Sequence, residues 1–327
     1  MKAAWYRRNG PAQDVLEVGE LPTPMPDPGE VRVLMHTSGV NPSDVKSRLK
    51  RPLNAELIVP HSDGAGVIDA VGEGVPPERI GQRVWLWNAQ WQRPMGTACE
   101  QVALPAGQAV PLPEGIGFDE AACFGIPALT ALQAVHLAGP LQGTTVLVTG
   151  AGNAVGHFVT QLAVLQGAQV IGTAGSTARQ QHARDAGAAH VIDYRNEAVA
   201  DRLAEFTNGQ GVDVVIDMDF SSTAALLPHR ILRPHGQLVC YGSNQPGEVT
   251  VDFRTLLFNS LRLTFFIVYE LLPADRARAT TQLDGLLRAG TLRHTVAQTF
   301  ALDDIAAAHE AVETGSAVGN VVIRLQD

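Results

Sequence analysis

Cysteine is scarce in this chain of 327 residues, which contains only Cys99, Cys123 and Cys240. Three cysteines without a C-x-x-C pair cannot form a disulfide framework, which indicates a reducing environment such as the cytoplasm. Long apolar runs are lacking as well, because the longest, at residues 265–269, falls far short of the roughly 18 residues that span a membrane. Residues 1–11 also lack the apolar core of a secretory signal. We therefore expect a soluble cytoplasmic protein without a membrane partner.

Positive charge is in short supply too. Lys and Arg number 24 against 33 Asp and Glu, which gives a formal net charge of −9. A nucleic-acid partner is therefore not expected, since nonspecific binding depends on many contacts from Lys and Arg to phosphates. A local basic site for a single phosphate is compatible with this charge. The 45% hydrophobic and 17% charged residues are typical of a globular protein, and the length suggests about two domains.

Roughly the first 110 residues are broken into short extended segments by proline and glycine. Residues 21–29 contain four prolines, which remove backbone donors and bias the preceding residues away from helix. Strands are expected at residues 31–36, 64–72 and 83–87, where β-branched and apolar residues stand between turn signals. This part of the chain is expected to form a compact, barrel-like β region.

From about residue 119 the pattern changes to alternating helices and strands. After an alanine-rich helix at residues 120–137, the alternation predicts βαβ units and so a parallel sheet. Strands are expected at residues 145–149, 169–173, 191–193, 213–217, 237–241 and 261–269, and helices at 154–166, 177–186 and 273–289. The last strand, residues 320–325, needs a sheet to join and is expected to return to the N-terminal domain. The predicted domains are residues 1–120 with 268–327, and residues 121–267.

The strongest motif is a glycine-rich turn between a buried strand and an amphipathic helix, with the sequence VLVTGAGNAVG at residues 146–156. Such a turn presents backbone N–H groups and a helix N-terminus to a pyrophosphate. Gly150 and Gly152 fit the tight turn, and Gly156 permits close packing of the helix on the strand. Asn153 is expected at a positive φ, which asparagine tolerates better than most residues. The alternative is an ordinary glycine-rich turn without a ligand. The predicted dinucleotide contacts are Gly152, Asn153, Ala154 and Val155.

The residues after the second predicted strand of this domain indicate which dinucleotide binds. NAD sites usually end this strand with an acidic residue that binds the ribose 2′-hydroxyl, whereas residues 171–179 contain none. Ser176 and Arg179 can instead bond a 2′-phosphate, and Tyr194 ends the next strand nearby. NADPH is therefore the predicted cofactor; the alternative for Arg179 is an ordinary solvated helix residue.

Several segments, taken in order, resemble a known family. They are GVNPSD at residues 39–44, VPHSDGAGVIDAVG at 59–72, GQRV at 81–84, GTAG at 172–175, GAAHVIDYR at 187–195, AH at 308–309 and GNVV at 319–322, together with the phosphate turn. Over essentially its whole length the chain is similar to the zinc-free quinone oxidoreductase, or ζ-crystallin-like, family of the medium-chain dehydrogenase/reductase superfamily. The resemblance implies an α/β fold that combines a Rossmann doubly wound parallel sheet with a GroES-like β-rich catalytic domain. It also implies that the cofactor lies in a cleft between these two domains.

The resemblance further implies which residues contact cofactor and substrate. Asn41 and Asp63 are expected as the catalytic residues. Asn41 would donate an amide hydrogen bond near the nicotinamide ribose or the substrate oxygen, or would only form the turn before Pro42. The alternative for Asp63 is that it only organises its loop. Lys46 stands where many relatives have a nearby tyrosine, and would contact cofactor phosphate or be an ordinary surface lysine. The remaining implied cofactor contacts are Thr130, Gly175, Tyr241, Gly242, Ser243 and Phe266.

Zinc is not expected in this chain. Zinc-dependent members of the superfamily have a cysteine at the position of Asn41, a histidine at that of Ser62 and another cysteine near Ile126. Cys123 stands close to the last of these positions without partner ligands, and His61 is expected to be a loop or core histidine. Three scattered cysteines also cannot form the four-cysteine structural zinc lobe found in that branch.

The predicted activity is zinc-independent reduction of quinones or similar conjugated carbonyls by NADPH. A quinone is already a good hydride acceptor, so its reduction needs orientation and proximity more than a Lewis acid. Two other enzymatic interpretations stay open: reduction of alkenal or alkenone double bonds, and reduction of 2-enoyl thioesters, which the lack of tyrosine in residues 43–56 disfavours. A non-enzymatic NADPH-binding structural or RNA-binding role is a further alternative, and the net charge of −9 counts against RNA.

A homodimer is expected from the last strand of the parallel sheet. Residues 261–269 are strongly β-prone and apolar on both faces, and the last strand of a Rossmann sheet lies at its edge. A two-fold partner that pairs through the same strand would cover this edge, which is also how the family usually assembles. The alternative is that the chain's own C-terminal helix covers it.

Overall fold

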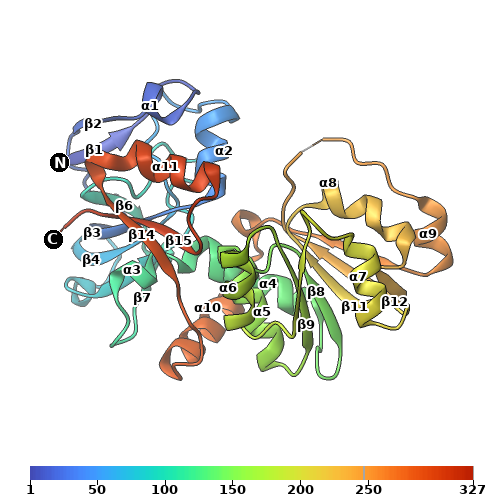
Figure 1. Cartoon of the computed structure of the whole chain (residues 1–327). Coiled ribbons are helices and arrows are strands. Elements are labelled where there is room, and N and C mark those ends of the chain that lie inside the picture. The colour runs from blue at the N-terminus through green and yellow to red at the C-terminus, as the bar shows by residue number, and fades with distance from the viewer. Residues whose placement is uncertain (246, 327) are drawn as a thin grey trace. The chain divides into compact units, whose positions relative to one another are not determined.

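The computed structural model describes residues 1–245 and 247–326, which form two units. The first unit combines Met1–Ile126 with His294–Asp327, and the second unit is Pro127–Arg293 (Figure 1). The expected α/β class, with one β-rich unit and one parallel-sheet unit, is confirmed. No helix in the described part of the chain is long and apolar enough to cross a membrane.

The first unit is built on a seven-stranded sheet in the order β14-β15-β3-β4-β5-β7, with β6 paired to β3 off this path. The last strand, β15 (Asn320–Arg324), pairs antiparallel with β3 (Glu30–Val40), which confirms the predicted return of the chain end. The other strands are β1 (Lys2–Trp5), β2 (Glu17–Glu20), β4 (Asp63–Val71), β5 (Arg83–Leu86), β6 (Gln101–Pro105), β7 (Ala109–Pro111) and β14 (Val296–Ala301). The helices are α1 (Ala12–Val15), α2 (Pro42–Lys50), α3 (Phe118–Ala121) and α11 (Ile305–Thr314), with 3₁₀ turns η1 (Pro77–Arg79), η2 (Ala106–Gln108) and η6 (Leu302–Asp304).

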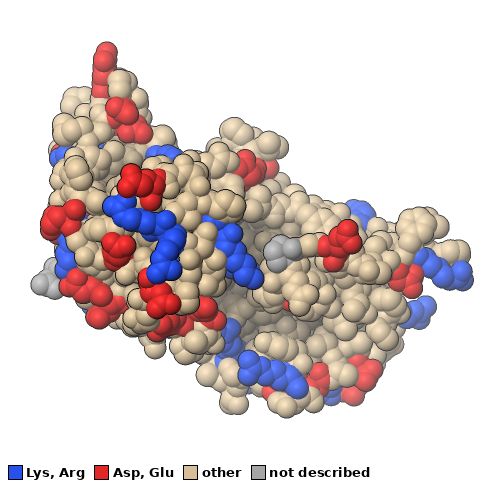
Figure 2. Space-filling model, turned by 90° about the horizontal axis from the view of Figure 1, so that it is seen from above, with Lys and Arg blue, Asp and Glu red and all other residues tan. Residues whose placement is uncertain are grey.

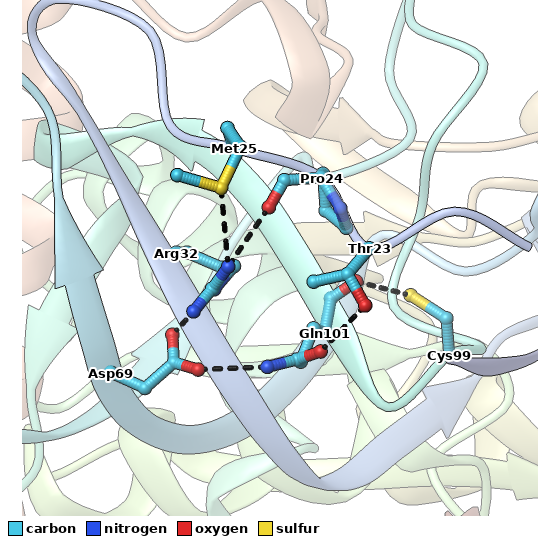
Figure 3. Close-up of polar contacts among 7 residues, drawn as sticks. All are labelled: Thr23, Pro24, Met25, Arg32, Asp69, Cys99 and Gln101. Atoms are coloured by element: carbon cyan, nitrogen blue, oxygen red, sulfur yellow. Dashed lines mark hydrogen bonds and ion pairs between the residues drawn. The ribbon is translucent and has the colours of Figure 1, made fainter.

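Side chains of the sheet hold the proline-rich segment, which has few backbone donors of its own (Figure 3). Arg32 on β3 donates from Nε to Asp69 Oδ1 at 2.9 Å and from Nη1 to the Pro24 carbonyl at 3.2 Å. Gln101 on β6 donates to the other oxygen of Asp69 at 2.8 Å and accepts from Thr23 Oγ1 at 3.3 Å. The extended segment is therefore fixed by polar contacts that replace a strand ladder.

The second unit contains a six-stranded parallel sheet in the order β10-β9-β8-β11-β12-β13. The strand order reverses between β8 and β11, and ligands of such sheets bind beyond the carboxyl ends of the strands at this reversal. The strands are β8 (Thr145–Val148), β9 (Gln169–Ala174), β10 (His190–Asp193), β11 (Val212–Asp217), β12 (Leu232–Cys240) and β13 (Arg262–Phe265). The helices are α4 (Leu129–Ala138), α5 (Ala154–Leu165), α6 (Thr177–Asp185), α7 (Val199–Phe206), α8 (Phe220–Thr223), α9 (Phe253–Phe258) and α10 (Pro273–Arg288), with 3₁₀ segments η4 (Ala224–His229) and η5 (Val268–Glu270).

The prediction of one continuous helix at residues 120–137 is wrong. The chain forms α3, then a π-helical turn η3 (Phe124–Ala128), and only then α4. Pro127 lies inside this turn, where it supplies no N–H and its ring crowds the preceding helical turn. The interruption matters for the site below, because it turns the backbone N–H of Ile126 towards Asp63.

Two expectations near the end of the second unit also need correction. The strand expected at residues 261–269 is shorter, since β13 ends at Phe265 and the 3₁₀ turn η5 follows. The domain boundary expected at residue 268 lies instead at Arg293, and the earlier boundary lies at Ile126 and not at residue 120. The reason is that α10 packs on α4, with Ala279 and Leu283 buried.

The charged side chains of the described residues are mixed in sign on the face drawn in Figure 2, where acidic and basic groups alternate over short distances. No broad basic area is present on that drawn face.

Candidate active site

The phosphate turn links β8 to α5 and depends on three glycines. Gly150 has a φ of +65°, a left-handed conformation that glycine adopts without strain. A Cβ on Gly152 would overlap the backbone carbonyl of Arg179, and a Cβ on Gly156 would overlap the carbonyl of Gly150. The tight turn and the close helix packing expected from the sequence are therefore present. Ala154 and Val155 begin α5 directly after the turn.

Asn153 departs from its expected conformation. Its φ is −93°, because it serves as the N-cap residue of α5 and not as a left-handed turn residue. Its side chain is engaged on both ends: Oδ1 accepts a hydrogen bond from Arg179 Nη1, and Nδ2 donates to Met218 Sδ at 3.0 Å. Asn153 thus ties the phosphate turn to Arg179, the residue predicted to recognise a 2′-phosphate.

A basic cluster surrounds the end of β9. Ser176 caps α6 and its Oγ accepts the backbone N–H of Arg179 at 3.4 Å. A Cβ on Gly175 would lie 2.6 Å from Tyr194 Oη and 3.0 Å from Arg195 Nε, so these two side chains lie directly over the glycine. Burial lowers the pKa of the Arg179 guanidinium, Tyr194 opposes this change, and the positive charge of Arg195 lowers it further. Two arginines, a tyrosine hydroxyl and a serine hydroxyl therefore meet at one place.

The sequence interpretation missed Arg195. Its signal was present, because Arg195 follows Tyr194 at the carboxyl end of β10, and β10 is the parallel neighbour of β9. Carboxyl ends of neighbouring parallel strands share one edge of the sheet, so both residues were bound to lie near Ser176. Its guanidinium forms no ion pair with any described carboxylate, which leaves it available to an anion.

Most of the other predicted cofactor residues of the second unit follow strands of the sheet, and one lies in a helix. Tyr241, Gly242 and Ser243 follow β12, and Phe266 follows β13, with the Tyr241 and Phe266 rings 6.4 Å apart. These residues extend the same carboxyl edge of the sheet. Thr130 lies in the first turn of α4 and is only 4% exposed. Its contact with a cofactor stays a prediction.

In the first unit, the structure brings Asn41 and Asp63 together. Asn41 is the N-cap residue of α2, and its backbone N–H donates to Asp44 Oδ2 at 2.8 Å. Its amide Nδ2 donates to Asp63 Oδ2 at 2.9 Å, and the N–H of Ile126 donates to the same oxygen at 2.9 Å. Asn41 is 5% exposed and Asp63 is fully buried. Asp63 therefore fixes the positions of the Asn41 side chain and of the η3 turn by accepting a hydrogen bond from each.

Burial raises the pKa of the carboxyl groups of Asp44 and Asp63. It raises the pKa of Asp44 to about 7, against the hydrogen bonds from Asn41. It raises the pKa of Asp63 well above its ordinary value, against the hydrogen bonds from Ile126 and Asn41. Gly125 closes over this group, because a Cβ there would overlap Asp63 Oδ1, an atom without a hydrogen-bond partner. A residue with a side chain at position 125 would displace Asp63.

A buried chain of hydrogen bonds runs from the carbonyl of Asp63 to His309. The carbonyl can only accept, and this determines which atom donates in each of the other hydrogen bonds. Thr97 Oγ1 donates to the carbonyl of Asp63, so Ser38 Oγ must donate to Thr97 across 2.7 Å. Ser38 therefore accepts from His61 Nδ1 at 2.8 Å. Burial lowers the pKa of His61 to about 3, so the ring is neutral and its Nε2 accepts. His309 must then donate from Nε2 at 2.9 Å, which leaves its buried Nδ1 without a partner, as observed.

Lys46 lies exposed in the middle of α2, and its expected contact with cofactor phosphate stays a prediction. His61 was expected to be a loop or core histidine. It is a core histidine, since it is fully buried between Ser38 and His309. Its φ of +77° turns it into this network, away from a surface loop.

Comparison with known proteins places these units in a family. Residues 27–114 match the family model for the alcohol dehydrogenase GroES-like domain, and residues 154–284 match that for zinc-binding dehydrogenase. A quinone oxidoreductase from Pseudomonas aeruginosa is 33% identical over 318 residues, which cover 95% of both chains. The chain belongs to the medium-chain dehydrogenase/reductase superfamily. It is therefore an NAD(P)H-dependent oxidoreductase.

The chain is also similar to two further reductases. A 2-haloacrylate reductase from a Burkholderia species is 29% identical over 336 residues, covering 99% of this chain and 98% of that protein. The crystal structure of Escherichia coli quinone oxidoreductase complexed with NADPH has a TM-score of 0.90 at 27% identity, and covers 99% and 100% of the two chains.

The superfamily includes zinc enzymes, so the ligand positions need a test. At those positions the chain has Asn41, which bonds Asp63, and Ser62, which is 1% exposed, while the N–H of Ile126 is bound to Asp63. Cys123 Sγ donates to the Asp119 carbonyl at 3.4 Å. Across the described residues no three His, Cys, Asp or Glu side chains gather where they could hold a metal ion. The donor set does not fit a zinc site, and metal independence stays a prediction.

Proposed function

We propose that this protein is an NADPH-dependent, zinc-independent reductase that transfers reducing equivalents to quinones. The observation that carries the proposal is the buried Asn41–Asp63 hydrogen bond, which holds an amide side chain at a position where zinc enzymes of the superfamily have a metal ligand. A hydrogen-bond donor at that position can orient an acceptor but supplies no Lewis acid. Such a site suits an acceptor that is already electrophilic, as a quinone is.

NADPH fits the residues of the second unit and would supply the hydride when bound. The N–H groups of the phosphate turn, including those of Gly152 and Ala154, would bind the pyrophosphate. Arg179 and Arg195 would form charge-assisted hydrogen bonds to the 2′-phosphate, with Ser176 and Tyr194 beside them. The crystal structure of a similar quinone oxidoreductase with NADPH supports the same cofactor here.

Asn41 would orient the acceptor or the nicotinamide ribose with its amide, and Asp63 would act through Asn41 as a positioning residue. This role for Asp63 follows from its burial, which keeps it from touching an acceptor directly. The hydroquinone oxygen that forms on reduction is a phenolate, and water can protonate it without a protein acid. We further propose a cytoplasmic location on the cysteine content, and no nucleic-acid partner on the net charge of −9.

Reduction of a conjugated C=C bond is the second candidate function. The 2-haloacrylate reductase among the relatives favours it, since a haloacrylate is a conjugated carboxylate. The chain would use the same cofactor residues for either reaction. The two functions differ only in the acceptor.

The test is NADPH oxidation by the purified full chain with a panel of quinones, enals and enones, before and after exhaustive chelation. Quinone turnover that survives chelation, in protein without stoichiometric zinc, is the expected result. Activity that appears only after zinc is added would overturn the mechanism, and turnover confined to enals or enones would favour the second candidate.

We also propose that the protein is a homodimer that pairs through β13. This strand ends the sheet order, and Phe265 and Ile267 beside it are 55% and 46% exposed. The N–H of Phe266 donates inward to the Cys240 carbonyl at 3.1 Å, so the N–H of Phe265 faces the open edge. Phe265→Pro should therefore dissociate the dimer without breaking the pairing of β12 with β13, whereas Phe266→Pro should destabilise the subunit itself. Light scattering of wild type at micromolar concentration should give twice the 34.8 kDa chain mass, and a single-chain mass would contradict the proposal.

A further inference from the structure

The first unit contains a pocket of about 190 Å³ that the proposed function leaves unused. Its walls come from the chain after β1, the segment that follows α2 and the loop after β5. Leu53 and Ile58 supply apolar wall, Trp91 and Tyr6 supply aromatic wall, and Arg51 lies at the rim. The lining also includes the polar Asn54, Gln90 and Gln92, and the volume is below that of a typical drug-sized ligand pocket, so the pocket suits only a small part of an organic molecule.

Of the described residues that line this pocket, Arg51 alone carries a formal charge. Its guanidinium lies over the Trp91 ring, 4.7 Å from the ring centre, and forms no ion pair with any described carboxylate. Two other arginines of the first unit are paired: Arg7 with Glu56 at 2.8 Å, and Arg48 with Glu313 at 2.7 Å. Stacking on the indole holds the guanidinium plane and leaves its N–H edge for an anion.

The backbone of Arg51 is held firmly at the end of α2. Its N–H donates to the Ser47 carbonyl at 3.0 Å, and its carbonyl accepts from Asn9 Nδ2 at 3.0 Å. The base of the side chain is therefore fixed although the guanidinium itself reaches solvent. A fixed base reduces the entropy lost when an anion is bound.

Tyr6 provides a second polar group in this pocket. The residue is only 3% exposed, yet its hydroxyl makes no hydrogen bond to any described residue. Burial raises the pKa of Tyr6 to about 12, with Asp44 raising it further and Arg51 opposing, so the hydroxyl keeps its proton as a donor. The hydroxyl oxygen is not among the fully buried polar atoms that lack a partner, so it reaches the open pocket, where a ligand oxygen can accept its hydrogen bond.

We propose that this pocket binds the carboxylate of a planar, ring-bearing acceptor. The carboxylate pairs with Arg51, the Tyr6 hydroxyl donates a second hydrogen bond, and the ring system lies along Trp91, Leu53 and Ile58. This inference rests on the proposed function, and it adds that the natural acceptor is an anion.

The separation of Arg51 from Asn41 also restricts the length of the acceptor. Asn41 precedes α2 and Arg51 follows it, so their backbones lie about 15 Å apart along the helix. A compound that reaches from Asn41 to the arginine side chain needs a ring system between its reducible atoms and its carboxylate. A carboxylated naphthoquinone has this shape, whereas a short acrylate does not.

Binding is tested first without turnover, by calorimetry on the full chain with 2-naphthoate and its neutral isostere 2-naphthamide. Wild type should bind the acid about tenfold or more tightly than the amide, since a hydrogen bond to a charged group contributes about 1.5–3 kcal/mol. Arg51→Gln should abolish this difference, and Tyr6→Phe should reduce it. Lys50→Gln, which removes a neighbouring positive charge outside the pocket, should preserve it. Equal binding of acid and amide by wild type would overturn the proposal.

Turnover is tested with 1,4-naphthoquinone and a carboxylated 1,4-naphthoquinone as acceptors. Arg51→Gln should raise the KM for the carboxylated quinone about tenfold relative to the KM for the neutral quinone. Quinone turnover without any effect of Arg51 on the carboxylated substrate would overturn the acceptor role. Naphthoate binding that depends on Arg51, in a protein that reduces no quinone at all, would instead refute the proposed function and support the anion pocket.

Discussion

The nucleotide-binding edge of the second unit and the Asn41 region of the first unit are built in opposite ways. The former consists of backbone and glycine, with long basic side chains placed around it at the ends of neighbouring strands. The latter consists of buried polar side chains, each held by another that is distant in the sequence, such as Asn41 by Asp63 and His61 by His309. A local motif therefore specifies cofactor binding, whereas acceptor orientation depends on the whole fold of its unit.

The largest effect is expected where the nucleotide site depends on charge. Arg179→Ala combined with Arg195→Ala removes two charge-assisted hydrogen bonds to a 2′-phosphate, each worth about 1.5–3 kcal/mol. NADPH affinity should fall by about a hundredfold or more, to the level of NADH, whose affinity should hardly change. Fluorescence titration with both nucleotides measures this. Arg184→Ala, an exposed arginine on the same helix, should bind NADPH normally. Wild type that binds NADH as tightly as NADPH would contradict the assignment.

A smaller loss is expected from the backbone of the same site. Gly152→Ala places a methyl group against the carbonyl of Arg179, so the turn must shift. Overpacking of this kind costs about 1–3 kcal/mol, and NADPH and NADH should both bind about 10- to 100-fold more weakly. Gly285→Ala, in α10 where a Cβ meets open space, is the matched control and should bind both nucleotides normally. Unchanged nucleotide binding by Gly152→Ala would show that the turn does not approach the cofactor.

These two sites also differ in how far the sequence could predict them. The β8–turn–α5 unit was predicted correctly, because strand, glycines and amphipathic helix are contiguous in the chain. Arg195 was missed because its position depends on which strand lies beside β9, and Asn153 was given the wrong φ because it is the N-cap residue of α5, with its side chain bonded to Arg179. The sequence alone could not show that His61 faces His309, since 248 positions separate them and only the return of the chain end joins them.

In the acceptor region, a single substitution tests whether Asn41 and Asp63 act as a pair. Asn41→Ala leaves a buried oxygen of Asp63 with one donor where it had two, which should lower the free energy of unfolding by about 1–3 kcal/mol and reduce kcat/KM. All four tryptophans, Trp5, Trp85, Trp87 and Trp91, lie in the first unit, so their fluorescence in urea reports on that unit. Asn41→Ala with Asp63→Ala should cost less than the two single changes added together. Additive losses would mean that the two residues act independently.

The smallest effect, and the most dependent on pH, is expected from the buried histidine pair. Burial lowers the pKa of His61 to about 3, and burial next to His61 lowers that of His309 well below 6.5, the value expected in the unfolded chain. Below pH 6.5 the two histidines bind protons in the unfolded chain but stay neutral in the folded chain. Their contribution to the free energy of unfolding is therefore complete above pH 6.5 and is lost as the pH falls. Asp44 acts in the opposite sense, because its pKa of about 7 lets the folded chain keep a proton that the unfolded chain has lost.

His309→Gln separates these opposing contributions. The destabilisation that it causes should be greatest above pH 6.5 and should shrink by up to about 1.4 kcal/mol per pH unit as the pH falls towards 5, because only wild type still loses the His309 contribution. Urea titrations followed by tryptophan fluorescence, which reports on the unit that contains His309, measure the difference at pH 5 to 8. A destabilisation by His309→Gln that is the same at every pH would mean that the pKa of His309 is equal in the folded and the unfolded chain, so that the fold does not keep the ring neutral. The proton order derived for His61 and Ser38 would survive that result, since a neutral and a charged His309 can both donate from Nε2 to His61 Nε2.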